Sequence, residues 1–116
     1  MARGDIAGRE GFGEGTAMTL GSAREEFTLM LARLILWANE QGYRPRIGAV
    51  LEQEGHKENS NHYIGLAADM PVFQPGATEQ DLEAHRRMHD CWDSLGGAPR
   101  IEKDLNHYSV KWMNMW

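Results

Sequence analysis

Two histidines and two aspartates stand in short runs whose residue types could hold a metal ion. His62 and Asp69 lie in the run Ser60–Asp69, and Asp104 and His107 lie in a second run near the end of the chain. Two imidazoles and one carboxylate form the ligand set of an open zinc site, which keeps a position for water. A further carboxylate close to such a site can take a proton from that water. If these groups converge, His62, Asp69 and His107 would hold Zn²⁺, Asp104 would be the catalytic general base, and the chain would be a zinc hydrolase.

The spacing of His62 and Asp69 favours a loop that leads into a strand. Gly65 and the apolar alternation that follows it argue against one continuous helix. In an extended segment, an odd spacing directs side chains to opposite faces, so we expect His62 in the loop before the strand. Gly65 would supply the unusual backbone geometry of that loop. Without further support the spacing is weak evidence, because single histidines are more often surface or core residues than ligands.

A second histidine pair, His85 and His89, has the spacing of two metal ligands on one helix. No glutamate follows His85 as in the His-Glu-x-x-His pattern, since Arg86 and Arg87 stand there. Two cations beside a metal ion are electrostatically unfavourable. We therefore expect His85 to pack inward near Trp92 and His89 to lie at the edge of the core.

Periodic apolar residues predict two main helices and short strands. Ser22 and Glu25 fit a capping box, and apolar residues then recur at helical spacing, which predicts a helix over residues 23–41. A second helix is expected to start at Thr78, with an inner face of apolar residues and one histidine. That face comprises Leu82, His85, Met88, Trp92 and Leu95. Strands are expected over residues 46–51 and 65–73, and a strand or hairpin over residues 101–110.

This order of elements suits a small α+β domain, with helices covering one face of a small antiparallel sheet. The 116 residues are enough for one domain. We expect the glycine-rich residues 1–21 to form a flexible tail and residues 22–116 to form the folded domain. The single cysteine, Cys91, excludes an intrachain disulfide and is expected to be a buried apolar residue.

Composition argues against two classes of partner. The formal net charge is −5, and no cluster of lysine and arginine with interleaved aromatic residues occurs, which argues against nucleic-acid binding. No apolar run is long enough to span a membrane. No signal peptide is visible. We expect a monomer that is made and first held in the cytoplasm.

The two runs resemble the signature of the zinc D-Ala-D-Ala carboxypeptidase-like peptidases. This family includes the phage endolysins that cut between L-alanine and D-glutamate. Ser60, His62, Gly65, Ala67 and Asp69 fill the first motif in its usual order, with the short gap between His62 and Gly65 that is common in the endolysin branch. Asp104 and His107 fill the second motif.

The resemblance implies a fold like that of the D-Ala-D-Ala peptidases and hedgehog-type domains. It implies zinc on His62, Asp69 and His107, with Asp104 as the base. The implied substrate is the peptidoglycan stem peptide. The implied role is that of a phage lysis enzyme which is made in the host cytoplasm and acts on the cell wall after release.

One departure from the family pattern concerns the arginine that normally precedes the ligand histidine and polarises the substrate carbonyl. Residues 52–59 contain no arginine, although Gln53 can match the glutamine of the pattern. Arg44 and Arg46 lie earlier, and Lys57 or a protonated His56 are the other cations that could replace the arginine. The departure leaves open a catalytically inactive phage structural or cell-wall-binding protein that keeps the fold and the metal. An unrelated α+β protein with coincidental histidines is a third alternative.

The chain ends on two tryptophans, Trp112 and Trp116, in a segment that also contains two methionines. We expect these side chains to pack on the domain. The alternative is an exposed apolar patch that docks on the cell wall or on a protein.

Overall fold

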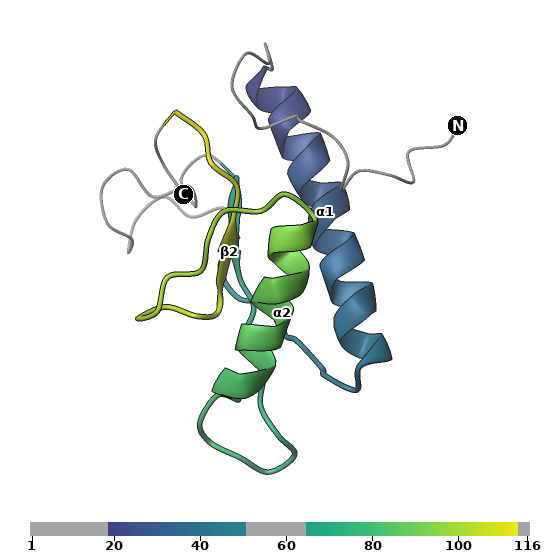
Figure 1. Ribbon diagram of the computed structural model, residues 1–116, viewed down its shortest axis with the longest axis vertical. Helices are drawn as coiled ribbons and strands as arrows, with labels where there is room; N and C mark the ends of the chain where they lie inside the picture. The colour runs from purple at the N-terminus through teal and green to yellow at the C-terminus, as the bar shows by residue number, and fades with distance from the viewer. Residues whose placement is uncertain (1–18, 51–64, 114–116) are drawn as a thin grey trace.

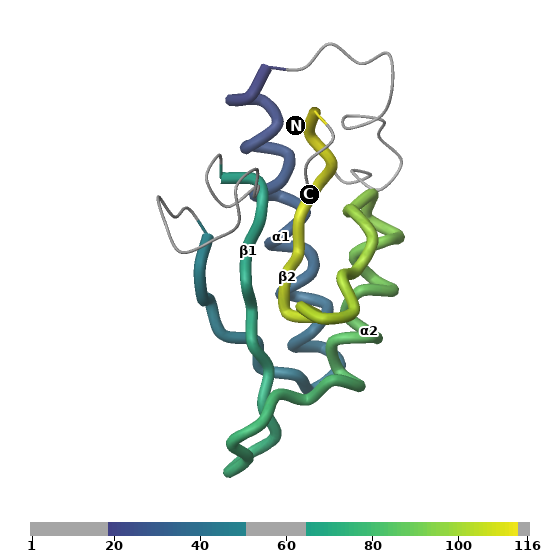
Figure 2. The backbone as a smooth tube through the Cα atoms, turned by 90° about the vertical axis from the view of Figure 1, so that its left-hand side faces the viewer, coloured from purple at the N-terminus to yellow at the C-terminus, as the bar shows by residue number. Residues whose placement is uncertain are grey.

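The computed structural model describes residues 19–50 and 65–113 (Figure 1). Its elements follow in the order α1 (Leu20–Glu40), β1 (Ala67–Asp69), α2 (Leu82–Ser94) and β2 (His107–Ser109). The two strands pair in an antiparallel sheet, and α1 and α2 pack together beside it (Figures 1 and 2). The expected small α+β fold, with two helices and an antiparallel sheet, is therefore confirmed.

Both helices begin at other residues than predicted, because other side chains cap them. The Oγ1 atom of Thr19 accepts a hydrogen bond of 3.0 Å from the backbone N–H of Ser22, so α1 starts at Leu20 and not after Ser22. The Oδ1 atom of Asp81 accepts a hydrogen bond of 3.0 Å from Ala84, so α2 starts at Leu82 and not at Thr78. Aspartate and threonine both satisfy free N–H groups at a helix start.

The strands are shorter than predicted, and the segment at residues 46–49 lies along β1 without forming a regular ladder. Gly48 donates to the Asp69 carbonyl at 2.7 Å, and the Asp69 N–H donates to the Ala49 carbonyl at 2.7 Å. Gly48 and Ala49 thus both lie opposite Asp69, as two residues lie opposite one in a β-bulge. Beyond Asp69, Pro71 has no N–H to continue a ladder. Figure 2 shows this segment running beside β1.

Alternate strand residues point toward the helices and form the core. The buried strand-side residues are Leu66, Ala68, Met70, Val72, Tyr108 and Val110. On α1 the buried apolar residues are Ala23, Phe27, Met30, Leu34 and Ala38. The opposite face of the sheet is consequently formed by the odd-numbered strand residues, among them Asp69 and His107.

The predicted inner face of α2 is confirmed at its centre. Met88 and Trp92 are fully buried, whereas Leu82 is 50% exposed because it is the first residue of the helix. Cys91 is only half-buried, and burial raises the pKa of its thiol. Trp112 is half-buried against the core, as expected, whereas Trp116 lies outside the described residues.

Three polar side chains of α2 bind β2 and the turn before it. His89 Nε2 lies 2.8 Å from the Leu105 carbonyl, which must accept the hydrogen bond. His85 Nδ1 lies 2.7 Å from the Tyr108 hydroxyl. Trp92 Nε1 donates to the Ser109 carbonyl at 2.7 Å. Both histidines are therefore structural, as expected for His85, but His89 is fully buried and not at the edge of the core.

The free energy of unfolding is expected to fall as the pH drops from about 6.5 to about 4. Burial lowers the pKa of His85 from 6.5 to about 4, and burial also lowers the pKa of His89. Between these pH values the unfolded chain binds more protons than the folded one, so the stability present above pH 6.5 is lost on acidification. For His85 this amounts to about 3 kcal/mol.

Urea unfolding at pH 7, 5.5 and 4 measures this loss. The His85→Gln variant is the control, because its amide can still bind Tyr108 but does not titrate. It should show a shallower pH dependence than the unchanged protein. Equal slopes for the two proteins would contradict a buried neutral His85.

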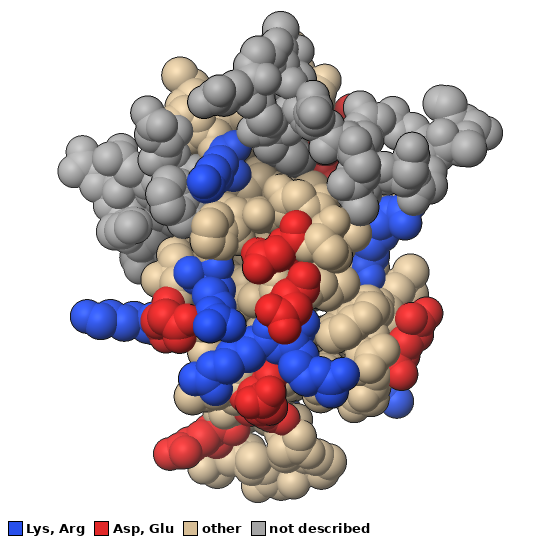
Figure 3. Space-filling view, viewed as in Figure 1, with Lys and Arg blue, Asp and Glu red and all other residues tan. Residues whose placement is uncertain are grey.

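The described surface carries charges of both signs. On the face shown in Figure 3, acidic side chains lie among the lysines and arginines, so the charges offset one another locally. Within residues 19–50 and 65–113, no helix has the length and apolar character needed to cross a membrane.

Candidate metal centre

The register of the sheet places Asp69 directly opposite His107. The pairs are Ala67 with Ser109, Ala68 with Tyr108, and Asp69 with His107. Met70 donates to the Asn106 carbonyl, so the neighbouring pair is hydrogen-bonded and the Asp69–His107 pair is not. In an antiparallel sheet, the side chains of a non-hydrogen-bonded pair approach each other most closely. The sheet itself therefore brings this carboxylate and this imidazole together.

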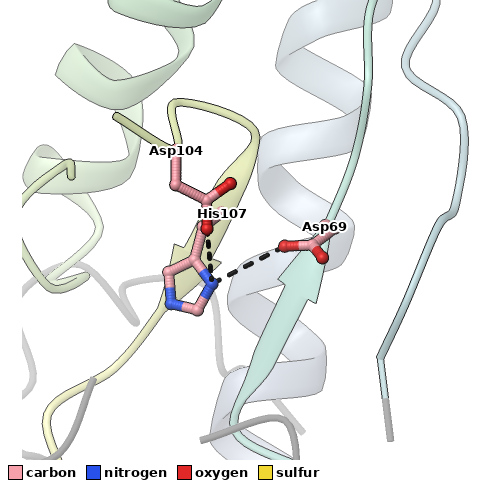
Figure 4. Close-up of side chains that lie close together, drawn as sticks. All are labelled: Asp69, Asp104 and His107. Carbon is pink, nitrogen blue, oxygen red and sulfur yellow. Dashed lines mark ion pairs between the residues drawn. The ribbon is translucent and has the colours of Figure 1, made fainter. Parts of the chain in front are cut away.

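The turns that precede β2 bring the Asp104 side chain close to His107. Its N–H donates to the Ile101 carbonyl at 2.8 Å, and its own carbonyl accepts from the His107 N–H at 3.0 Å. This local winding places the Asp104 carboxylate on the same side as the His107 ring (Figure 4). The side chain of Asp104 is 53% exposed, whereas that of His107 is 6% exposed. The group thus opens to solvent on the Asp104 side.

The distances within this group suit a shared cation. His107 Nδ1 lies 3.6 Å from Asp69 Oδ1 and 3.9 Å from Asp104 Oδ2 (Figure 4). Ligand atoms bound at 2.0–2.2 Å in a tetrahedral zinc site lie about 3.3–3.6 Å from each other. All three potential ligand atoms lie within 4.8 Å of one another. One imidazole nitrogen and two carboxylate oxygens also match the N and O ligands that zinc accepts.

The backbone of Asp69 has neighbours on both edges of β1, and these fix the position from which its side chain extends. One edge of β1 pairs with β2, and on the other edge Asp69 exchanges two hydrogen bonds with Gly48 and Ala49. A Cβ atom on Gly48 would lie 2.9 Å from the Asp69 carbonyl oxygen and 3.5 Å from the Asp69 Cβ. Glycine at this position lets the segment approach closely enough to hold the candidate ligand.

The Gly48→Ala substitution is therefore expected to weaken zinc binding about tenfold, as the loss of other groups that orient a ligand does. The added methyl group must push Asp69 away from its place opposite His107. Isothermal titration calorimetry with zinc measures the effect. Ile47→Ala is the control, since Ile47 is 61% exposed and should leave the affinity unchanged. Unaltered affinity in Gly48→Ala would contradict the role given to this contact.

The turn that carries Asp104 and His107 is supported from the core side of the sheet. His89 binds the carbonyl of Leu105, which lies between the two. Its ring stacks on that of Tyr108 with a centroid distance of 4.3 Å. The supporting roles of His89 and Gly48 were not predicted from the sequence, because they depend on partners distant in the chain.

The structure brings together three of the four predicted site residues: Asp69, Asp104 and His107. His62 lies outside the described residues, as do Gln53, His56 and Lys57. Gly65 has a φ of +74°, which confirms the backbone geometry predicted for it. Arg44 and Arg46 line a cavity to which none of the three grouped residues contributes.

Comparison with known proteins adds no family assignment. No protein-family model, no curated protein and no solved structure matches this chain. The assignment of a function consequently depends on the two motifs and on the geometry of Asp69, Asp104 and His107.

Proposed function

We propose that the protein is a zinc-dependent peptidase that hydrolyses a peptide bond of the peptidoglycan stem peptide, with a role in phage lysis. The observation that carries this proposal is the convergence of Asp69, Asp104 and His107 on one side of the sheet. These residues belong to two separate motifs that resemble, in order and type, those of the D-Ala-D-Ala carboxypeptidase-like family. The hedgehog-type fold of that family is part of the proposal.

In this proposal Asp69 and His107 hold the ion from adjacent strands. His62, three residues before Gly65 in the sequence, would complete the ligand set. His107 would bind through Nδ1, the nitrogen that faces both carboxylates. Zinc, when bound, supplies a Lewis acid that polarises a carbonyl group and acidifies water.

Asp104 is the proposed general base. Its carboxylate is the most exposed of the group, so an attacking water and a substrate can both reach it. It would accept a proton from the water and return it to the leaving amine, as one carboxylate can do in successive steps. Asp69 is less suited to this role because its exposed fraction is 24% and its backbone is held on both edges of β1.

The experiment is hydrolysis of purified peptidoglycan by the zinc-loaded protein, compared with its Asp104→Asn variant. We expect the variant to retain zinc and to lose about 100-fold or more in rate, the usual contribution of a general base. Asp90→Asn, on the exposed surface of α2, is the matched control and should be as active as the unchanged protein.

Three other outcomes would change the assignment. Equal rates for the unchanged protein and Asp104→Asn would exclude Asp104 as the base. Loss of zinc in Asp104→Asn would make Asp104 a ligand instead. Stoichiometric zinc without any hydrolysis would favour a binding protein that has kept the metal and lost turnover.

A further inference from the structure

A cavity of about 560 Å³ lies beyond the C-terminal end of β1, and none of Asp69, Asp104 and His107 lines it. One wall is formed by residues 42–44 and 46, which follow α1, and the other by residues 72–77, which follow β1. Figure 2 shows these two segments at the lower end of the molecule. The volume is within the range of small-molecule sites, about 300–1,000 Å³.

Two arginines line this cavity, and neutral partners orient both. The Cζ atom of Arg46 lies 4.6 Å from the centre of the Phe73 ring. Arg44 Nη1 donates a hydrogen bond to the amide oxygen of Asn39. Cation–π and amide contacts fix a guanidinium without neutralising its charge. Each guanidinium group thus has one neutral contact and keeps further N–H donors for a ligand.

A third arginine reinforces the positive charge at this end of the molecule. Arg87 donates to the Tyr43 hydroxyl at 2.8 Å and to the Gln41 amide oxygen at 3.3 Å. Within the described residues, none of Arg44, Arg46 and Arg87 forms an ion pair. Their guanidinium groups can therefore attract an anion to this end of the molecule.

Among the residues that the structure describes, no carboxylate lines the cavity to compete with an anion. The carboxylate oxygens of the nearby Asp81 already accept two hydrogen bonds. One comes from the backbone N–H of Ala84 at the start of α2, and the other comes from the Gln74 amide. That capping bond from Ala84 is the main reason why the pKa of Asp81 is lowered. The other lining side chains are largely apolar or aromatic, namely Tyr43, Val72, Phe73, Pro75 and Ala77.

We propose that this cavity binds an organic anion, a carboxylate or phosphate group carried on an apolar or aromatic body. The guanidinium groups of Arg44 and Arg46 would bind the anionic group, for which their planar fork is suited. Tyr43 and Phe73 would contact the body of the ligand, since aromatic rings provide large contact areas. The site is independent of the metal centre and of the proposed hydrolysis.

The test is a titration of the full chain, followed by amide NMR shifts, with phenyl phosphate and with benzoate at constant ionic strength. We expect saturable shifts at residues 42–46 and 72–77, with a Kd of about 1 mM for the tighter of the two. The tighter ligand identifies the preferred anionic group. Benzyl alcohol, which has the aromatic ring without the charge, should bind at least tenfold more weakly.

Matched variants separate this site from general attraction of anions. The Arg44→Gln/Arg46→Gln double variant should bind at least tenfold more weakly. Arg100→Gln should bind as the unchanged protein does, because Arg100 already pairs with Glu102. Shifts that do not saturate, that map elsewhere or that persist in the double variant would overturn the proposal. Because neither ligand nor variant involves Asp69, Asp104 or His107, failure here leaves the peptidase proposal untouched.

Discussion

Replacing His107 with alanine is expected to lower zinc affinity by more than about 100-fold while the fold remains. Loss of a group that only orients a ligand costs 10–100-fold, and loss of a ligand itself costs more. His107 supplies the one nitrogen that faces both carboxylates of the group, Asp69 and Asp104. Asp69→Ala should have a similar effect, because it removes the carboxylate opposite that nitrogen in the sheet. Competition with a zinc-sensitive dye measures both affinities.

Two controls test whether the loss is specific to the group. His85→Gln removes another buried histidine, but one whose ring nitrogens lie against Tyr108 and Gln80. Asp93→Asn removes an exposed carboxylate from α2. Both variants should bind zinc within about threefold of the unchanged protein, since distant sites are usually independent. A loss of affinity in either control, or its retention in His107→Ala, would remove the assigned ligands.

The Gly97→Ala substitution is expected to reduce the free energy of unfolding by about 3 kcal/mol or more. A Cβ atom on Gly97 would overlap the indole ring of Trp92, at its Nε1, Cδ1 and Cε2 atoms. Trp92 is fully buried and donates to the Ser109 carbonyl at 2.7 Å. To make room, the ring must shift, which adds overpacking strain to a broken buried hydrogen bond.

Thermal unfolding measures this effect, and the expected fall in Tm is more than about 10 °C for a domain of this size. Gly21→Ala is the control. Its Cβ would meet only Thr19 Oγ1 at 3.9 Å, and alanine favours the helix that contains it. We expect Gly21→Ala to be neutral or slightly stabilising. A Gly97→Ala variant as stable as the unchanged protein would contradict the packing of Trp92 described above.

Local sequence patterns predicted whether a main element is a helix or a strand better than they predicted its first and last residues. Apolar residues recur at helical spacing between residues 27 and 38, because a helix on the surface of a core buries one face. The structure confirms this for α1, where Phe27, Met30, Leu34 and Ala38 are buried. The start of α1 could not be predicted, because Thr19 and Ser22 are both acceptable caps and only the folded chain selects between them. Pro71 and the bulge at Gly48 shortened the regular strands.

Asp69, Asp104 and His107 were all predicted from the sequence, but the geometry that groups them was not. Asp104 and His107 are close in the chain, so a turn suffices to bring them together. Asp69 meets His107 only through the register between β1 and β2, and no local pattern determines that register. The contact of Gly48 with Asp69 likewise depends on a third segment. The residues around Gly48 in the sequence do not distinguish a glycine that allows a close contact from a glycine in a turn.

In the proposed metal centre, folding gathers Asp69, Asp104 and His107 around one divalent ion. A crystal structure of the zinc-loaded protein, with anomalous difference density at the zinc edge, would show whether this is so. We expect a single peak about 2.0–2.2 Å from His107 Nδ1 and from an Asp69 carboxylate oxygen. A protein saturated with zinc that shows no peak between these side chains, or binds its zinc elsewhere, would contradict it.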